Sequence, residues 1–143
     1  MIWYSAGCSS SLLPCATLLA NHGIRVPALF TYAELHRERI LEQALRYPGP
    51  RFLDSGAFTV ATRGASIRLA DYIAFCTQYA DHFGVMAALD VIGNEDATWV
   101  NYCEMLAAGL RPIPTWHITS SPRALRRVVE AAEYFAIGGM VGM

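Results

Sequence analysis

Lysine is absent from this sequence, and charged residues of every kind are scarce. All 11 basic residues among the 143 are arginines, and 12 acidic residues bring the formal net charge to −1. Only 16% of the residues are charged, against about 25% in an ordinary soluble domain. A net charge this close to zero argues against a nucleic-acid-binding protein that works by bulk electrostatic attraction. Five of the arginines form two clusters typical of solvated helix faces, at Arg37 and Arg39 and at Arg123, Arg126 and Arg127.

The sequence also lacks the patterns of membrane insertion, export and metal binding. No apolar run of about 18 residues is uninterrupted, which argues against a membrane-spanning helix. Residues 1–7 lack the basic stretch and apolar stretch of a secretory signal peptide. Cys8, Cys15, Cys76 and Cys103 form neither a C-x-x-C pair nor a cluster with histidine at metal-ligand spacing. We therefore expect a cytoplasmic protein with no membrane partner, no disulfide framework, no metal site and no cofactor.

Apolar residues, in contrast, are abundant. They make up 54% of the chain, which is too much for a disordered segment. The length suits a single domain spanning residues 1–143, since domains cluster at roughly 100–150 residues. Either the core is large for this length, or apolar surface is left for a partner, which keeps a homo- or hetero-oligomer open.

Short apolar runs alternate with helical patterns along the chain. Strands are predicted at residues 2–4, 26–32, 51–54, 84–90, 113–117 and 133–139. Helices are predicted at residues 12–22, 33–47, 67–82 and 94–108, and a last helix follows a cap at Ser120 or Ser121. Strands that alternate with helices are joined by crossovers, and this produces a parallel sheet. The predicted class is α/β.

The predicted helix at residues 94–108 has the clearest signals. Asn94 is a good N-cap, and Glu95 and Asp96 in the first turn favour the helix dipole. Its expected buried stripe consists of Val100, Cys103, Leu106, Ala107 and Leu110.

Residues of the types found in catalytic and binding sites recur where the predicted strands end. These positions are Asp54, Asp90, His117 and the glycine pair Gly138 and Gly139. The carboxyl ends of parallel strands open onto one face, so we expect these residues to converge on one pocket. Each also has a plainer interpretation: a helix cap for the acids, a bond to a loop carbonyl for the histidine, and a turn for the glycines.

Residues 7–11, Gly-Cys-Ser-Ser-Ser, follow the first predicted strand and precede a helix. Their backbone amides could cradle a phosphate, as at other helix N-termini. The Gly-Lys-Ser/Thr of a P-loop is missing, so we interpret the segment as a helix entry and keep an anion site as the alternative.

Two motifs carry a family resemblance. Residues 52–59, Phe-Leu-Asp-Ser-Gly-Ala-Phe-Thr, resemble the Asp-Ser-Gly-Gly-Phe-Gln motif of tRNA-guanine transglycosylases, also called queuine tRNA-ribosyltransferases. Residues 134–142 resemble their Ile-Gly-Gly-Leu-Ala-Val-Gly segment. Between the two motifs, Asp90 stands where the family has an acid that reads the base, and His117 stands near a family glutamine. The resemblance covers residues 51–143 in the family's order.

This resemblance implies a (β/α)8 TIM-type barrel that exchanges guanine for a 7-deazaguanine in tRNA, or in DNA in a related branch. It implies that Asp54 is the catalytic general acid and base, and that Asp90 accepts hydrogen bonds from the exocyclic amine and ring N–H of the base. The implied base pocket is completed by Ser55, His117, Gly138 and Gly139. The expected partners are a tRNA or DNA substrate and a purine or 7-deazapurine base.

The chain also departs from the family. Ala57 and Thr59 replace a glycine and a glutamine, which puts the specificity for base or polymer in question. The family's nucleophilic aspartate and its zinc-binding insertion follow the Gly-Gly segment and would lie beyond residue 143, so neither is assigned here. A TIM barrel takes about 250 residues, so we expect the N-terminal portion of one. A base-binding module that needs a partner for catalysis, and an unrelated TIM-barrel enzyme, stay open as alternatives.

Overall fold

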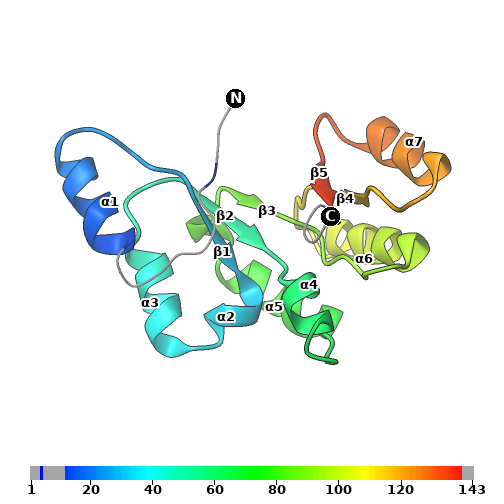
Figure 1. The fold of residues 1–143 in the computed structure, drawn as a ribbon, viewed down its shortest axis with the longest axis horizontal. Coiled ribbons are helices and arrows are strands. Elements are labelled where there is room, and N and C mark those ends of the chain that lie inside the picture. The colour runs from blue at the N-terminus through cyan, green and yellow to red at the C-terminus, as the bar shows by residue number, and fades with distance from the viewer. Residues whose placement is uncertain (1–3, 5–11, 140–143) are drawn as a thin grey trace.

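The chain alternates between helices and short strands (Figure 1). The computed structural model describes Tyr4 and residues 12–139. The elements, in chain order, are α1 (Leu12–Asn21), β1 (Ala28–Thr31), α2 (Tyr32–Leu35), α3 (Glu38–Arg46), β2 (Arg51–Asp54), α4 (Ala57–Ala61), α5 (Leu69–Gln78), the 3-10 helix η1 (Ala80–His82), β3 (Val85–Met86), α6 (Glu95–Ala107), β4 (Thr115–His117), α7 (Pro122–Ala131) and β5 (Ala136–Gly138). None of the helices in the described part of the chain is long and apolar enough to cross a membrane.

All the strand pairs are parallel, which confirms the predicted α/β class. β1, β2 and β3 form one sheet, in which Leu53 of β2 pairs with Phe30 on one side and Met86 on the other. β4 and β5 form a second, two-stranded sheet. An isolated parallel bridge between Ala87 and Ile113 joins the two sheets, and the Ile113 amide donates to the Met86 carbonyl at 2.8 Å. Within each sheet the strands therefore follow chain order, and the bridge links the segment after β3 to the segment before β4.

The main core lies between the three-stranded sheet and its helices. Leu53 is fully buried at its centre, and α5 covers the sheet with Tyr72 and Cys76. The Tyr72 hydroxyl donates to the Ala87 carbonyl at 2.9 Å, so the one polar atom of this buried ring is satisfied. The helix α5 is thereby tied to the segment that leads to Asp90.

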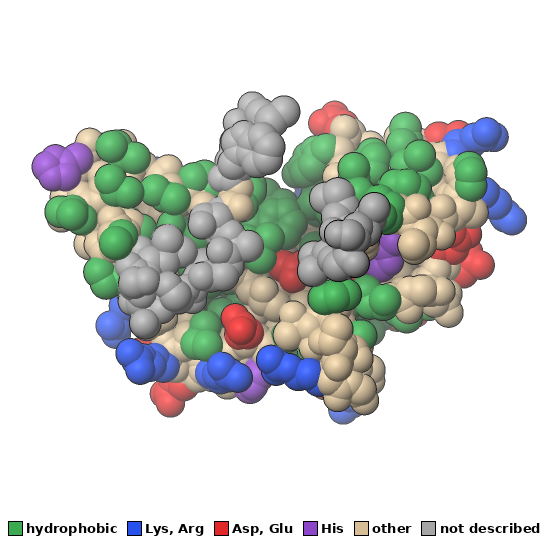
Figure 2. Space-filling view, in the orientation of Figure 1, with side chains coloured by type: hydrophobic (Ala, Val, Ile, Leu, Met, Phe, Trp, Pro, Cys, Tyr) green, Lys and Arg blue, Asp and Glu red, His purple; other side chains and the backbone are tan. Residues whose placement is uncertain are grey.

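Apolar side chains also reach the surface. Figure 2 shows them gathered over α1 and over the end of the molecule that carries β5 and α7. The exposed residues at these two places are Leu18, Leu19 and Ile24, and Val129, Tyr134 and Ile137. The high apolar content is therefore divided between a core and uncovered surface. An oligomer remains a prediction.

Several predicted elements are observed where the sequence placed them. The run at residues 51–54 is β2, and the helix predicted at residues 12–22 is α1, with Gly23 at φ 79° just past its end. Both predicted N-caps are observed, because Asn94 Oδ1 accepts from the Ala97 amide at 3.0 Å and Ser121 Oγ accepts from the Ala124 amide at 3.2 Å.

Other elements differ from the prediction. The helix predicted at residues 33–47 divides into α2 and α3, because Arg37 is extended and its carbonyl accepts the first bonds of a new helix. The helix predicted at residues 67–82 ends at Gln78 and is followed by η1, and α4 was not predicted. The strand predicted at residues 84–90 pairs only through β3 and the bridge at Ala87.

Three predicted features fall wholly or partly outside the described residues. They are the strand at residues 2–4, apart from Tyr4, the loop at residues 7–11, and the end of the second motif at residues 140–142. The Tyr4 ring packs against Phe52 of β2, with 5.4 Å between the ring centroids.

The predicted buried stripe of α6 was wrong. Val100, Cys103, Leu106 and Ala107 are exposed, and of the stripe only Leu110, just past the helix, is buried. The helix instead buries Thr98, Tyr102 and Met105. Thr98 tolerates burial because its hydroxyl accepts from the Val91 amide at 2.9 Å and donates to the Asn94 carbonyl at 2.9 Å.

Two neighbouring residues test the corrected face of α6. Met105 is 0% exposed and Leu106 is 43% exposed. Met105→Ala should cost about 2–5 kcal/mol of unfolding free energy, because it removes buried methylenes and leaves a cavity. Leu106→Ala should change it by less than about 0.5 kcal/mol, as expected for a surface site. Urea denaturation of both variants measures the difference, and a larger loss for Leu106→Ala would contradict the assigned face.

Candidate functional site

The chemistry-bearing residues meet at one edge of the parallel strands, as the sequence predicted. Asp54 ends β2 and Ser55 follows it, while Asp90 lies a few residues beyond β3. His117 ends β4 and Gly138 ends β5, where they are paired in the ladder. Hydrogen-bond contacts join Asp90 to Ser55 and to His117, and Gly138 lies close against the His117 ring. The edge shared by carboxyl ends of parallel strands is where α/β proteins place their sites.

Asp90 is the centre of a hydrogen-bonded network. Its Oδ1 accepts from the Ser55 hydroxyl at 2.7 Å, and its Oδ2 lies 2.8 Å from Nε2 of His117. With its proton on Nε2, the imidazole donates to the carboxylate. The side chains of Asp90 and His117 are 14% and 8% exposed, and Ser55 is buried. A carboxylate oxygen has two lone-pair sites, so Asp90 can still accept from a ligand while it holds both partners.

The Asp54 carboxyl differs from that of Asp90 in its hydrogen-bond partner and in its pKa. Its Oδ2 accepts from the Gly56 amide at 2.9 Å. Burial raises the pKa of the Asp54 carboxyl, and the nearby negative charge of Asp90 raises it further, while hydrogen bonds from the Gly56 and Ser55 amides oppose the rise. A carboxyl that holds its proton more tightly than usual is suited to general acid and base catalysis.

A glycine after Ser55 permits this arrangement. Gly56 has φ 75°, a conformation that favours glycine, and a Cβ there would lie 2.5 Å from Thr31 Cγ2 and 2.7 Å from Ala33 Cβ. The close approach to the chain after β1 lets β2 turn directly into α4. As a result Asp54 and Ser55 both remain at the strand edge.

Gly138 makes room for His117. A Cβ at Gly138 would lie 2.5 Å from Cδ2 and 2.9 Å from Nε2 of the imidazole, too close for any real side chain. Gly139 has φ 79°, is exposed, and lies beside His117 and Ile118. The structure thus places both predicted glycines at the histidine, where Gly138 supports the ring that bonds Asp90.

A second polar cluster near His117 was missed by the sequence reasoning. The Glu95 carboxylate accepts from both the amide and the hydroxyl of Ser121, each at 2.6 Å, and these bonds lower the pKa of Glu95. The first turn of α6 is thereby tied to the start of α7, which follows His117 at the end of β4. The two residues are 26 positions apart, and only the N-cap role of Ser121 could be predicted locally.

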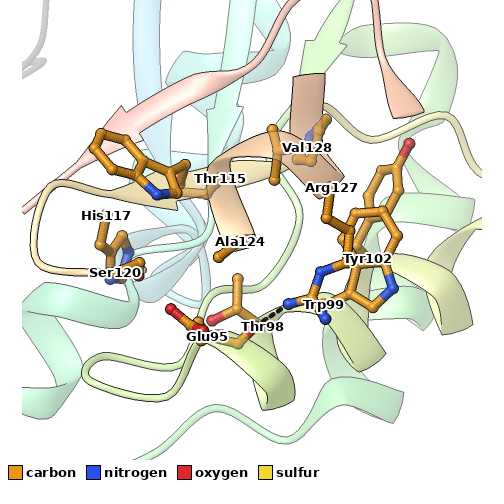
Figure 3. A pocket seen from close by; sticks show the side chains of 12 residues that line it. Glu95, Thr98, Trp99, Tyr102, Thr115, His117, Ser120, Ala124, Arg127 and Val128 are labelled. Carbon is orange, nitrogen blue, oxygen red and sulfur yellow. Dashed lines mark hydrogen bonds between the residues drawn. The ribbon is translucent and has the colours of Figure 1, made fainter. Parts of the chain in front are cut away.

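Figure 3 shows a narrow cleft between β4, α6 and α7, and Glu95 is one of the residues that line it. His117 and Ser120 lie towards one end of it, and Arg127, Trp99 and Tyr102 lie towards the other. The cleft is therefore lined by the end of β4 on one side and by α6 and α7 on the other.

Two observations on the described residues concern metal ligands and thiols. Over Tyr4 and residues 12–139, no three His, Cys, Asp or Glu side chains are placed to hold a metal ion. Cys76 is buried, and burial raises its pKa to about 12, which makes it inert as a nucleophile. Asp71, Asp81 and Asp96 are exposed.

Comparison with known proteins assigns no family to this chain. A scan of protein-family models and searches of curated proteins and of solved structures each found no match. The candidate site therefore rests on its geometry and on the motifs that form it.

The raised pKa of Asp54 predicts how stability depends on pH. The folded state prefers the neutral carboxyl, so wild-type protein loses stability as the pH rises from the unfolded pKa to the folded one. Asp54→Asn lacks this loss and should be the more stable protein at pH 7, with the difference shrinking below about pH 4. Thermal melts over pH 3–8 measure it, with Asp81→Asn as an exposed control. A variant that is less stable than wild type at pH 7 would contradict the buried-acid assignment.

Proposed function

We propose that this chain belongs to a nucleobase-exchange transglycosylase, which replaces guanine by a 7-deazaguanine in tRNA or DNA. The observation that carries the proposal is the half-buried Asp90, which is held between the buried side chains of Ser55 and His117 and lies near the raised-pKa carboxyl of Asp54. The order of residues along the chain, which resembles the transglycosylase motifs, supports the same function.

Asp90 is the group that would recognise the base. Guanine and 7-deazaguanine present a ring N–H and an exocyclic amine side by side, and a carboxylate accepts both. Ser55 and His117 hold the carboxylate in one orientation, so that its remaining lone pairs face the ligand. Adenine presents an unprotonated ring nitrogen at the same place, which repels the carboxylate and leaves it unpaired.

Asp54 is the group that would move the proton. When the bond between the sugar C1′ and N9 of guanine breaks, Asp54 delivers a proton to the departing base. When the 7-deazaguanine arrives, the Asp54 carboxylate takes the proton from its N9, and the new bond to C1′ forms. A carboxylate nucleophile on the other face of the sugar would hold the covalent intermediate between the two steps.

A partial TIM-type barrel is the architecture we propose for residues 1–143. The supporting observation is that each strand neighbours its successor from β1 to β5, with the Ala87–Ile113 bridge between the sheets. A doubly wound sheet would reverse this order at a switch point. The proposal includes a cytoplasmic location, supported by the free thiols of Cys15, Cys76 and Cys103.

Base binding without exchange is a second candidate. The covalent step needs a nucleophile, and in the proposal Asp54 holds the proton while Asp90 holds the base. A partner would then supply the missing group. The two candidates share the base pocket and differ only in whether exchange follows binding.

Calorimetric titration with guanine, 7-deazaguanine and adenine tests the base pocket. We expect the first two to bind and adenine to bind at least about tenfold more weakly, because one good hydrogen bond to a charged group is worth 1.5–3 kcal/mol. Asp90→Asn keeps one acceptor oxygen but loses the charge, and should weaken guanine binding by about tenfold. Asp81→Asn, an exposed acid, is the matched control. Equal affinity for adenine and guanine, or an unaffected Asp90→Asn, would overturn the proposal.

A further inference from the structure

A basic groove lies on the outer face of α6 and α7, away from the base pocket. Its volume is about 410 Å³. It is lined by Trp99, Arg123, Arg126, Arg127, Glu130 and Ala131. Figure 2 shows basic side chains at this end of the molecule. Three of the chain's 11 arginines thus share one small concavity with a single acid.

The three guanidinium groups are not equivalent. Arg127 is fixed, because it donates to Asp96 Oδ1 at 3.1 Å and to the Glu95 carbonyl at 3.2 Å, and its guanidinium carbon lies 4.8 Å from the centroid of the Trp99 ring. Arg123 and Arg126 are exposed and form no ion pair with any of the described residues. They are three residues apart on α7, a spacing that places their side chains on the same side of the helix.

The groove adjoins the cleft of Figure 3, which reaches His117. Trp99 and Arg127 line both the groove and the cleft of Figure 3, and His117 and Ser120 line that cleft towards the strand edge. The bond of Arg127 to Glu95 places its guanidinium at the start of α6, the end of the helix that follows Asp90.

We propose that this groove binds the phosphodiester backbone of a single-stranded nucleic acid, with Arg123 and Arg126 contacting phosphates beside the exchanged nucleotide. Guanidinium groups bind phosphate oxygens through paired, charge-assisted hydrogen bonds. The strand is single because a base must leave its stack to enter a protein pocket. The identification of the ligand as a nucleic acid rests on the proposed function. The assignment of Arg123 and Arg126 to phosphate contacts rests on the residues that line the groove.

Fluorescence anisotropy with labelled single-stranded DNA and RNA of about 10 nucleotides tests the groove. The Arg123→Gln, Arg126→Gln double variant should bind at least about fivefold more weakly than wild type. Its plot of log affinity against log salt should be shallower by about 1.4, because each lost phosphate contact removes about 0.7. The Arg37→Gln, Arg39→Gln double variant, which removes the other exposed arginine pair, should bind like wild type.

The outcomes separate this inference from the proposed function. If the Arg123 and Arg126 changes leave oligonucleotide binding unaffected, the proposal that this groove binds the phosphodiester backbone is wrong, even if guanine binds normally. Loss of oligonucleotide binding in that variant supports the groove, even if wild-type protein binds no guanine. Polyglutamate that competes as well as an unlabelled oligonucleotide would overturn the assignment to nucleic acid.

Discussion

Asp54→Asn should reduce base exchange by about 10²–10⁴-fold, the usual contribution of a positioned general acid and base. Asparagine keeps the shape of the side chain and an oxygen that can accept from the Gly56 amide. It cannot deliver a proton to the departing guanine or take one from the arriving base. Incorporation of radiolabelled guanine into tRNA and into DNA measures the rate, with wild-type protein assayed on both polymers.

Two controls separate the lost proton transfer from lost folding or binding. Asp54→Asn should be at least as stable as wild type at pH 7, for the reason given above. It should also bind guanine with an affinity close to that of wild type, because Asp90 rather than Asp54 is proposed to accept from the base. An exchange rate that survives in Asp54→Asn would refute the catalytic role of this residue.

The place of the candidate site could be predicted, and its internal bonds could not. Asp54, Asp90 and His117 follow short apolar runs, and parallel strands must expose their carboxyl ends on one side. This rule needs only the strand assignments, even approximate ones. As it predicts, Asp90 bonds to Ser55, directly after β2, and to His117, at the end of β4. The choice of Ser55 and His117 as partners of Asp90 depends on contacts 35 and 27 residues apart, which no local pattern encodes.

The errors in the fold have a similar cause. In α6 two different sets of residues recur at helical spacing, and the more apolar set, with Val100 and Leu106, faces outward. The observed face includes Thr98, which is polar but finds partners in the loop after β3. A periodicity argument weighs side chains by hydrophobicity and cannot foresee that a neighbouring loop satisfies a hydroxyl.

Gly138→Ala should weaken guanine binding by about 10–100-fold although it adds only a methyl group. That methyl would lie 2.5 Å from Cδ2 of His117, so the imidazole has to move and its bond to Asp90 is lost. A hydrogen bond to a charged group is worth about 1.5–3 kcal/mol, and 1.4 kcal/mol corresponds to tenfold in affinity. Calorimetric titration of guanine into the variant measures the loss.

Gly84→Ala is the matched control, because a Cβ at that position meets nothing within 4 Å, and guanine affinity should not change. A double-mutant cycle with His117→Ala identifies the route of the effect. If the added methyl acts by displacing the imidazole, it should cost little affinity once the imidazole is gone. A full loss in the double variant would instead mean that Gly138 contacts the base directly, as the sequence resemblance implied, and that His117 is not the residue it positions.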